Sequence, residues 1–382
     1  MDAAAALALG DVPVVDQHCH GLFAEVPTSD QRRWRQLFTE SEDPSGVATT
    51  VSYQRLLGRL AAFLGCQPVE DAVLAERGRW APLELAGALL RDAHIDALVV
   101  DTGYPPADEV LGTDAVGRAG GCEVATLLRV EPLMQDLVAA HQTVDETFEA
   151  FHAALEDLRG QGYAGLKSIV AYRSGLVVQR WDAGAVAVAF HAARGEAART
   201  GAVRLCGPDH KPLLDTLLRA ALAEASAQQL PVQFHTGYGD RDADLRLADP
   251  LHLRAVLEDP SYRGLTVVLL HGSYPFTRHA AILAALYPHV VLDISYGIPF
   301  LSLAELAAVT RAALGAAPAA RIVYSSDGVG VPELHWMAAQ DARRVLATTL
   351  TELVTSGELT FAQAQKWAEA ILATNARRLY AL

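Results

Sequence analysis

Short apolar runs recur along the chain, each followed by polar or glycine-containing residues and then by a longer stretch with helical spacing. The runs occupy residues 12–18, 95–103, 123–130, 163–170, 230–237, 265–272, 290–295 and 321–327. Because the runs are continuous rather than alternating, they are typical of parallel strands that are buried on both faces. Their alternation with helical stretches indicates βα units. The pattern therefore predicts an α/β protein built as a (β/α)8 TIM barrel.

Two stretches are longer than a simple barrel requires. Residues 30–93 look helical and form an insertion after the first strand, where we expect them to cap the barrel mouth. Residues 175–229 are long enough to hold an extra helix before the one that leads into the fifth strand. Because the sequence shows no repeat, low-complexity tract or flexible linker, a single domain over residues 1–382 is the simplest expectation.

Composition narrows the classes of partner. The net charge of −14 argues against a nucleic-acid partner, since neutralising phosphates needs a surplus of Lys and Arg. No apolar run reaches the ~18 residues of a membrane span, and the amino-terminal residues lack the basic region of a secretory signal. The four cysteines form no CxxC pair and are interpreted as reduced thiols. We therefore expect a cytoplasmic protein with a small-molecule substrate, and the apolar stretch 47–64 is a candidate homodimer surface.

Polar residues gather where the predicted strands end. His18 and His20 lie two apart in the first strand, and residues two apart in an extended strand face the same way. They therefore present two imidazoles to one point. The fourth, fifth, sixth and eighth strands end with Lys167, His235, His271 and Asp327. In a (β/α)8 barrel the active site lies at the carboxyl ends of the strands.

Each of these residues also has an ordinary structural interpretation. An isolated histidine at a strand end is more often hydrogen-bonded than metal-bound, and Asp327 followed by Gly328 is compatible with a simple turn. Taken together, these residues favour a metal site over separate structural roles, because burying several such groups without partners costs several kcal/mol in all. A shared metal is the simplest partner. Imidazole and carboxylate ligands suit zinc, with manganese or iron as alternatives.

The ordered set of motifs resembles the amidohydrolase superfamily over essentially the whole chain: His-x-His on strand one, Lys on strand four, His on strands five and six, and Asp on strand eight. The sequence segments GLKSIVAYRSGL and VYSSDG are similar to those of one branch, the nodulin-type domain that is fused to glutamine-synthetase-like proteins.

The resemblance implies a set of ligands. In a two-metal version, His18, His20 and Asp327 bind the first metal and His235 and His271 bind the second. Lys167, carbamylated by carbon dioxide, bridges the two. In a one-metal version, the ligands are His18, His20, His235 and Asp327, Lys167 keeps its ammonium group, and His271 acts as a catalytic acid, base or electrophile. The sequence leaves both versions open.

The resemblance also implies a reaction, the hydrolysis of a C–N amide bond by metal-activated water. Asp327 accepts a proton from that water and delivers it to the leaving amine, and the second metal or His271 polarises the carbonyl. A carboxylate-bearing substrate, with a γ-glutamyl amide as one candidate, follows from the fused relatives. The candidate substrate contacts are Arg173, Tyr172, Arg129, Tyr238, Arg241 and Tyr296.

Two other classes of function compete with amide hydrolysis. The first is a mononuclear metal-dependent decarboxylase of an aromatic or unsaturated acid, in which Lys167 is unmodified. The pair Asp16 and Gln17 before the histidines weakly disfavours it, because decarboxylase relatives often place Glu or Ala there. The second is a barrel retained as a binding domain without catalysis, but every expected ligand is present.

Overall fold

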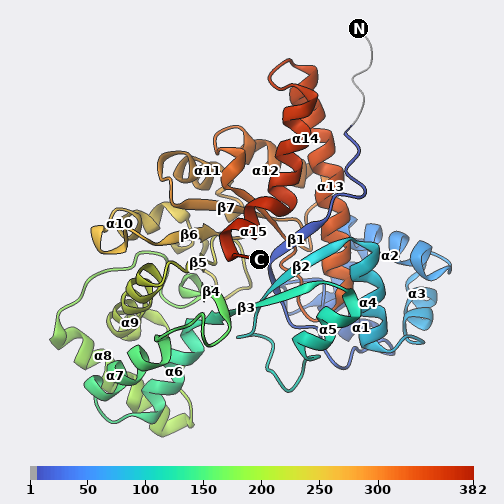
Figure 1. Ribbon diagram of the computed structural model, residues 1–382. Coiled ribbons are helices and arrows are strands. Elements are labelled where there is room, and N and C mark those ends of the chain that lie inside the picture. Colours follow the sequence, from blue (N-terminus) through green and yellow to red (C-terminus); the bar gives the residue numbers. More distant parts are fainter. Residues whose placement is uncertain (1–6) are drawn as a thin grey trace. The chain divides into compact units, whose positions relative to one another are not determined.

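Eight strands form one sheet in which neighbours in the chain are also neighbours in the sheet, from β1 to β8 (Figure 1). The structure is a computed structural model that describes residues 7–382. The first residues of the segment used to judge a secretory signal lie outside that range. The strands are β1 (Val14–His20), β2 (Ile95–Asp101), β3 (Glu123–Arg129), β4 (Tyr163–Ser168), β5 (Pro231–Phe234), β6 (Thr266–Leu269), β7 (Val290–Ser295) and β8 (Ile322–Ser325).

The pairing of the strands confirms the predicted (β/α)8 barrel. The pairs β1–β2, β3–β4, β4–β5, β5–β6 and β6–β7 are parallel. The chain that leaves β8 returns to β1, because the Asp327 amide donates to the His18 carbonyl at 3.0 Å. Beside it, the His20 amide donates to the Gly328 carbonyl at 2.8 Å. These bonds close the sheet between its first and last strands.

Helices separate the strands as the sequence predicts. The connecting helices are α4 (Pro82–Asp92), α5 (Thr113–Gly120), α6 (Val130–Ala140), α7 (Val144–Leu155), α8 (Ala183–Thr200), α9 (Gly207–Ala227), α10 (Arg254–Leu257), α11 (Thr277–Leu286) and α12 (Leu303–Leu314). After β8 the chain continues with α13 (Pro332–Thr355), α14 (Phe361–Glu369) and α15 (Asn375–Tyr380). The extra helix predicted within residues 175–229 is α8, which precedes α9.

The stretch 30–93 is helical, as predicted. It contains α1 (Gln31–Gln36), α2 (Val51–Leu64), α3 (Glu70–Arg77) and α4. The Asp30 carboxylate caps α1 by accepting from the Arg32 and Arg33 amides, and the Thr50 hydroxyl caps α2 by accepting from the Tyr53 amide. Gly65 ends α2 with a φ of +70°, a conformation that glycine adopts without strain. The expectation that this stretch caps the barrel mouth stays a prediction.

The buried core explains why the strands read as continuous apolar runs. Val14 and Val15 of β1 are inaccessible to solvent, and so are Val267, Val268 and Leu269 of β6. Consecutive side chains of a strand point to opposite faces, so these strands are buried on both. Each such side chain contributes about 1.5–3 kcal/mol on burial.

By their internal contacts the residues separate into two compact units. Unit 1 combines the residues up to Ala125 with Asp293–Leu382, and unit 2 is Thr126–Leu292. Unit 1 holds β1, β2 and β8, whereas unit 2 holds β4, β5 and β6. The single-domain organisation stays a prediction.

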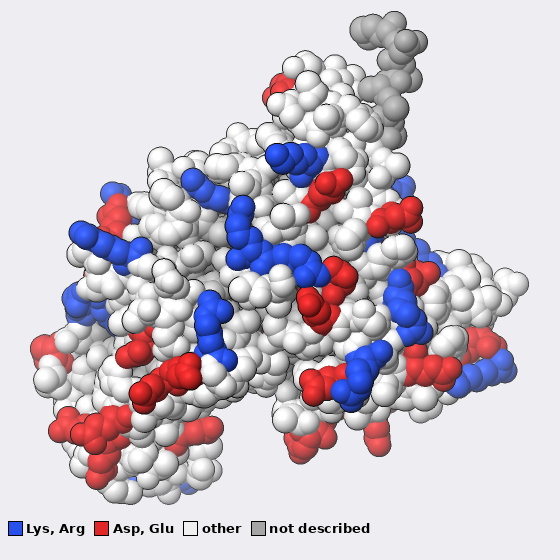
Figure 2. Space-filling model, viewed as in Figure 1, with Lys and Arg blue, Asp and Glu red and all other residues white. Residues whose placement is uncertain are grey.

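Basic and acidic side chains are interspersed on the face drawn in Figure 2. Among the helices of residues 7–382, none combines the length and the apolar character that a membrane crossing requires.

Candidate metal centre and active site

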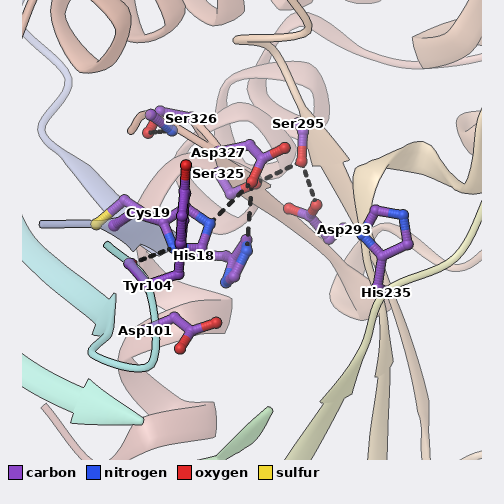
Figure 3. A network of polar contacts seen from close by, with 12 residues as sticks. His18, Cys19, Asp101, Tyr104, His235, Asp293, Ser295, Ser325, Ser326 and Asp327 are labelled. Carbon is purple, nitrogen blue, oxygen red and sulfur yellow. Dashed lines mark hydrogen bonds and ion pairs between the residues drawn. The ribbon is translucent and has the colours of Figure 1, made fainter. Parts of the chain in front are cut away.

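Unit 1 brings His18, His20 and Asp327 together. The Nε2 atom of His18 lies 3.3 Å from Asp327 Oδ1, and Nε2 of His20 lies 3.5 Å from the same oxygen. Figure 3 shows the contact between His18 and Asp327. The histidine rings stand edge to face with their centroids 5.0 Å apart. Although the ladder between β1 and β2 is irregular after Asp16, both imidazoles still reach one carboxylate, as the His-x-His spacing predicts.

The backbone fixes where Asp327 points. Its φ is +54°, in the left-handed region that Asp tolerates better than most residues other than glycine. The bond from its amide to the His18 carbonyl ties this turn to β1. The carboxylate is therefore placed by the closure of the barrel, and not by a flexible loop.

The three side chains fit a divalent cation. One ligand atom from each lies within 4.8 Å of the others, and two imidazoles with one carboxylate are a donor set that zinc accepts. The Nδ1 atom of His20 lies 3.1 Å from the Tyr104 carbonyl. Because only a protonated nitrogen donates to a carbonyl, this contact leaves Nε2 of His20 with the lone pair that a metal needs.

A buried hydrogen-bond network supports the same centre. The Asp16 carboxylate accepts from the Ser326 amide at 2.7 Å and from Nδ1 of His335 at 3.1 Å. Gly328 lies against this ring, because a Cβ there would be 2.7 Å from a ring carbon of His335. All three polar side chains are buried. The network joins β1 to the residues beside Asp327.

Asp16, Cys19 and His335 also approach one another closely enough to suggest a second metal group. Hydrogen bonds already occupy both oxygens of Asp16. Burial and the Asp16 carboxylate raise the pKa of the Cys19 thiol, which favours the protonated form over a thiolate ligand. We therefore interpret Asp16, Cys19 and His335 as residues that stabilise the neighbouring strand, and not as a second metal site.

A second polar network lies beside the first in unit 1. The Gln17 amide donates to Asp293 at 3.0 Å, and the Tyr380 hydroxyl donates to the Gln17 carbonyl oxygen at 2.8 Å. Ser295 donates to Asp293 and shares a hydrogen bond of 2.8 Å with Ser325 (Figure 3). These contacts satisfy the polar groups that the barrel interior buries.

In unit 2, His235 and His271 form a histidine pair. Their ring centroids are 4.5 Å apart, and both side chains are buried. Nε2 of His235 lies 2.7 Å from the Tyr238 carbonyl, to which a protonated Nε2 donates, so that Nδ1 is the ring nitrogen that carries the lone pair. His271 has a φ of +60° in a single 3₁₀ turn, η6 (His271–Ser273). Hydrogen bonds from Thr236 to the Leu270 carbonyl and with Ser273 hold this turn against β5.

Lys167 lies on β4 and is 2% exposed. In the ladder it is opposite Arg129 of β3 and Gln233 of β5. Burying a charged lysine ammonium group to this degree costs free energy. The cost is smaller when the lysine is chemically modified or when its charge is paired with an opposite charge. The position agrees with the predicted carbamylation site, but the modification itself stays a prediction.

Two of the predicted substrate contacts touch the histidine pair. The Tyr172 ring packs on His235 with centroids 4.3 Å apart, and the Tyr238 ring lies 5.9 Å from His271. Tyr172 belongs to η2 (Val170–Tyr172), directly after β4. Its hydroxyl reaches the loop after β5 at Gly239, where a Cβ would lie 2.1 Å from that oxygen. A side chain at this position would therefore displace the Tyr172 ring.

The remaining predicted contacts have different surroundings. Arg129 ends β3, Arg173 follows η2, and Arg241 lies in the loop after β5. Tyr296 is buried in unit 1, where its hydroxyl bonds to Thr310 of α12 at 2.9 Å. Because that bond already engages the hydroxyl, a substrate role for Tyr296 has no support from its surroundings and stays a prediction.

Sequence reasoning gave no contacts to three residues around these sites. Asp16 continues the two-residue period of His18 and His20, so its place on their face was available from spacing. The position of His335 just after the predicted eighth strand allows it to approach the site, although its partner Asp16 lies far away in the sequence. Arg204 carried no such signal, because its contact comes from a distant segment.

Comparison with known proteins identifies the family of this chain. The family model described as Amidohydrolase matches residues 133–382. The protein fluG of Emericella nidulans is 29% identical over 404 residues, and the match covers 97% of this chain. It covers 46% of fluG, so the chain spans about half the length of this relative.

Solved structures share the fold of this chain. A protein from Lactobacillus casei, itself described as a proposed metal-dependent hydrolase, is 28% identical with a TM-score of 0.86, over 98% of this chain and 96% of that one. A uronate isomerase from Thermotoga maritima is 13% identical with a TM-score of 0.68, over 97% and 95% of the two chains, and shares the fold alone. Together with the family match over more than half of its residues, these findings show that the chain belongs to the amidohydrolase family.

Proposed function

We propose that this protein is a metal-dependent hydrolase that cleaves a C–N amide bond of a small carboxylate-bearing substrate. The observation that carries the proposal is the group formed by His18, His20 and Asp327, whose ligand atoms lie within 4.8 Å of one another. Membership of the amidohydrolase family supports hydrolysis as the reaction. The description of the Lactobacillus casei relative supports metal dependence.

We assign Lys167, His235 and His271 to the same active site, because barrel enzymes gather their functional groups at the carboxyl ends of the strands. His235 and His271 directly follow β5 and β6, and Lys167 is the penultimate residue of β4. Zinc is the proposed metal, with one or two ions per chain and manganese or iron as alternatives. A divalent metal bound there polarises the amide carbonyl and lowers the pKa of the attacking water.

The chain's own residues then move the proton. Asp327 accepts a proton from the attacking water at its carboxylate and passes it to the nitrogen of the leaving amine. Its fixed backbone keeps the carboxylate beside the two imidazoles during this transfer. Tyr172 packs against His235 and thereby restricts the orientation of that ring.

The experiment is a panel of amides that includes γ-glutamyl amides and N-acyl amino acids, with amine release as the readout. We expect the wild-type chain to release amine from at least one of them. Asp327→Asn should lower the rate about a hundredfold or more, because it removes the proton acceptor. The exposed residue Asp11 supplies the matched control Asp11→Asn, which should leave the rate unchanged.

Two results contradict the proposal. The first is an Asp327→Asn variant that retains the wild-type rate. The second is release of carbon dioxide from aromatic or unsaturated acids without cleavage of any amide, which is the outcome expected of a decarboxylase.

A further inference from the structure

Three loops of unit 2 meet around Arg173. The three-loop cluster consists of Tyr172 and Arg173 after β4, residues 204–207 between α8 and α9, and residues 239–242 after β5. The Gly207 amide donates to the Arg173 carbonyl at 2.8 Å, which joins the first loop to the second. The close approach of Tyr172 to Gly239 joins the first to the third.

An ion pair joins the second loop to the third. The Arg204 guanidinium donates to the Asp242 carboxylate at 2.5 Å, and about half of each side chain is exposed. The pair holds the charge of Arg204 near Arg173 together with the Asp242 carboxylate, and the exposed part of Arg204 remains accessible to a ligand.

Arg173 carries a positive charge that no carboxylate contacts directly within residues 7–382. Its guanidinium forms no ion pair there, and its Nε atom is buried without a hydrogen-bond partner. The adjacent Ser174 hydroxyl is also buried without a partner. Leaving such groups unpaired is unfavourable, and more so where the group is charged. Burial and the neighbouring charge of Arg204 lower the pKa of Arg173.

The buried carboxylate of Glu131 acts on Arg173 without contacting it. Glu131 of α6 accepts from the Ser168 hydroxyl at 2.6 Å and from the Ile169 amide at 2.9 Å. These bonds hold it near β4, and it forms no ion pair with Arg173 within the described residues. Burial raises the pKa of Glu131. An anion from outside the chain would satisfy Arg173 instead.

We propose that the three-loop cluster is an anion subsite in which Arg173 binds a carboxylate of the substrate and Arg204 strengthens the positive field. A planar guanidinium suits a carboxylate because it donates two parallel hydrogen bonds. The subsite lies beside a candidate metal ligand, since Tyr172 precedes Arg173 and packs on His235. The role of this anion subsite in selecting substrates rests on the proposed amide hydrolysis. The binding of a carboxylate to Arg173 does not depend on that reaction.

The test compares two ligands that are not hydrolysed, glutarate and pentanoate, by calorimetry on the full chain as purified. The two have the same carbon chain and differ by one carboxylate. One carboxylate of either ligand can bind at the pair formed by His235 and His271 in the same unit, so the advantage of glutarate measures the second one. We expect glutarate to bind wild type about tenfold more tightly or better, as charge-assisted hydrogen bonds imply.

Arg173→Gln should abolish that advantage while leaving the affinity for pentanoate unchanged, and Arg204→Gln should reduce it. Arg246→Gln is the matched control, because Arg246 is an exposed arginine of the same unit that pairs with Asp244. The subsite is overturned if wild type shows no preference for glutarate, or if Arg173→Gln retains the preference. Binding needs no turnover, so a preference for glutarate without any amide cleavage refutes the proposed reaction and leaves the subsite standing.

Discussion

At the scale of single residues, Asp16 connects the two segments that make the candidate metal centre. Its carboxylate accepts hydrogen bonds from Ser326, next to Asp327, and from His335 of α13. It lies on the strand that carries His18 and His20. Outer residues of this kind orient metal ligands even though they do not touch the metal.

Replacing Asp16 should therefore weaken metal binding without removing a ligand. We expect Asp16→Ala to lower the affinity for zinc about 10-fold to 100-fold. Competition with a chromophoric chelator measures this affinity, and circular dichroism checks that the variant is folded. Asp16→Asn should bind better than Asp16→Ala, because its amide oxygen can still accept from Ser326. Equal affinities of Asp16→Ala and wild type would assign Asp16 a purely structural role.

The spacing of residues in the strands predicted which residues are candidates for the site. It did not predict the hydrogen-bond and ion-pair partners of the residues around them. The alternation of β1 places His18 and His20 on one face, and the order of strands indicates which later residues end at the same edge. Asp16 finds its partners 310 and 319 residues further along the chain, and no local pattern encodes such contacts. Arg204 is likewise defined by its pair with Asp242, 38 residues away.

At the scale of elements, a buried ion pair anchors the stretch 30–93 to the helix after β8. Arg77 of α3 forms two hydrogen bonds with Glu333 of α13, and both side chains are almost fully buried. The Arg77 guanidinium also lies over the Trp34 ring of α1, 4.8 Å from its centroid. One arginine thus joins three helices.

Removing Arg77 leaves the Glu333 carboxylate buried and unpaired. We expect Arg77→Met to lower the free energy of unfolding by about 3–5 kcal/mol. The double variant Arg77→Met/Glu333→Leu should recover much of that loss, since it removes the unpaired charge. Urea unfolding followed by circular dichroism measures both.

The matched control is Arg79→Ala, which breaks the exposed pair with Glu76 and should change the free energy by less than about 1 kcal/mol. If Arg77→Met is as mild as this control, the buried pair does not anchor α3.

A second ionic contact links α9 to the turn before β6. The Asp259 carboxylate accepts from the Ser261 amide at 2.9 Å and from Arg219 and Arg180 at 2.6 and 2.7 Å. The Ser261 amide and then these arginines hold the pKa of Asp259 below its usual range. A carboxyl group with a lowered pKa in the folded state stabilises the fold above its unfolded pKa of about 3.9 and loses that effect as the pH falls.

Asp259→Asn should therefore be less stable than wild type at pH 7. The difference should narrow as the pH falls below about 4, where wild type begins to lose the ionised carboxylate in the unfolded and then the folded state. Urea unfolding of both proteins at several pH values is the measurement. A difference that stays constant down to pH 3 would show that the ionisation of Asp259 contributes nothing.

The strands were predictable because their apolar runs are continuous, whereas their ends were less so. The run 230–237 predicts a longer strand than β5, which ends at Phe234. The ladder to β6 stops there, and His235 begins a turn in which its ring contacts the Tyr238 carbonyl. In the same way β8 ends at Ser325, two residues before Asp327. Hydrophobicity locates a buried strand, but the point where pairing stops depends on the neighbouring strand.

At the scale of the whole molecule, membership of the amidohydrolase family and the barrel constrain what the polar strand ends can do. They leave open whether Lys167 carries a carbamate and whether one metal or two are bound. Those two properties distinguish a binuclear hydrolase from a mononuclear site in which His271 is a catalytic group. The identity of the metal, the cytoplasmic location and a homodimer also stay predictions.

The most direct test of the metal centre is the metal content per chain of protein purified without chelator, determined together with its intact mass under non-denaturing conditions. We predict at least one divalent metal per chain in wild type and a loss of that metal in the double variant His18→Ala/His20→Ala. Two metals with a carbon dioxide adduct would identify the binuclear form with carbamylated Lys167, and one metal without an adduct the mononuclear form. A folded wild-type chain that holds no metal, even after incubation with zinc, manganese or iron, would contradict the account.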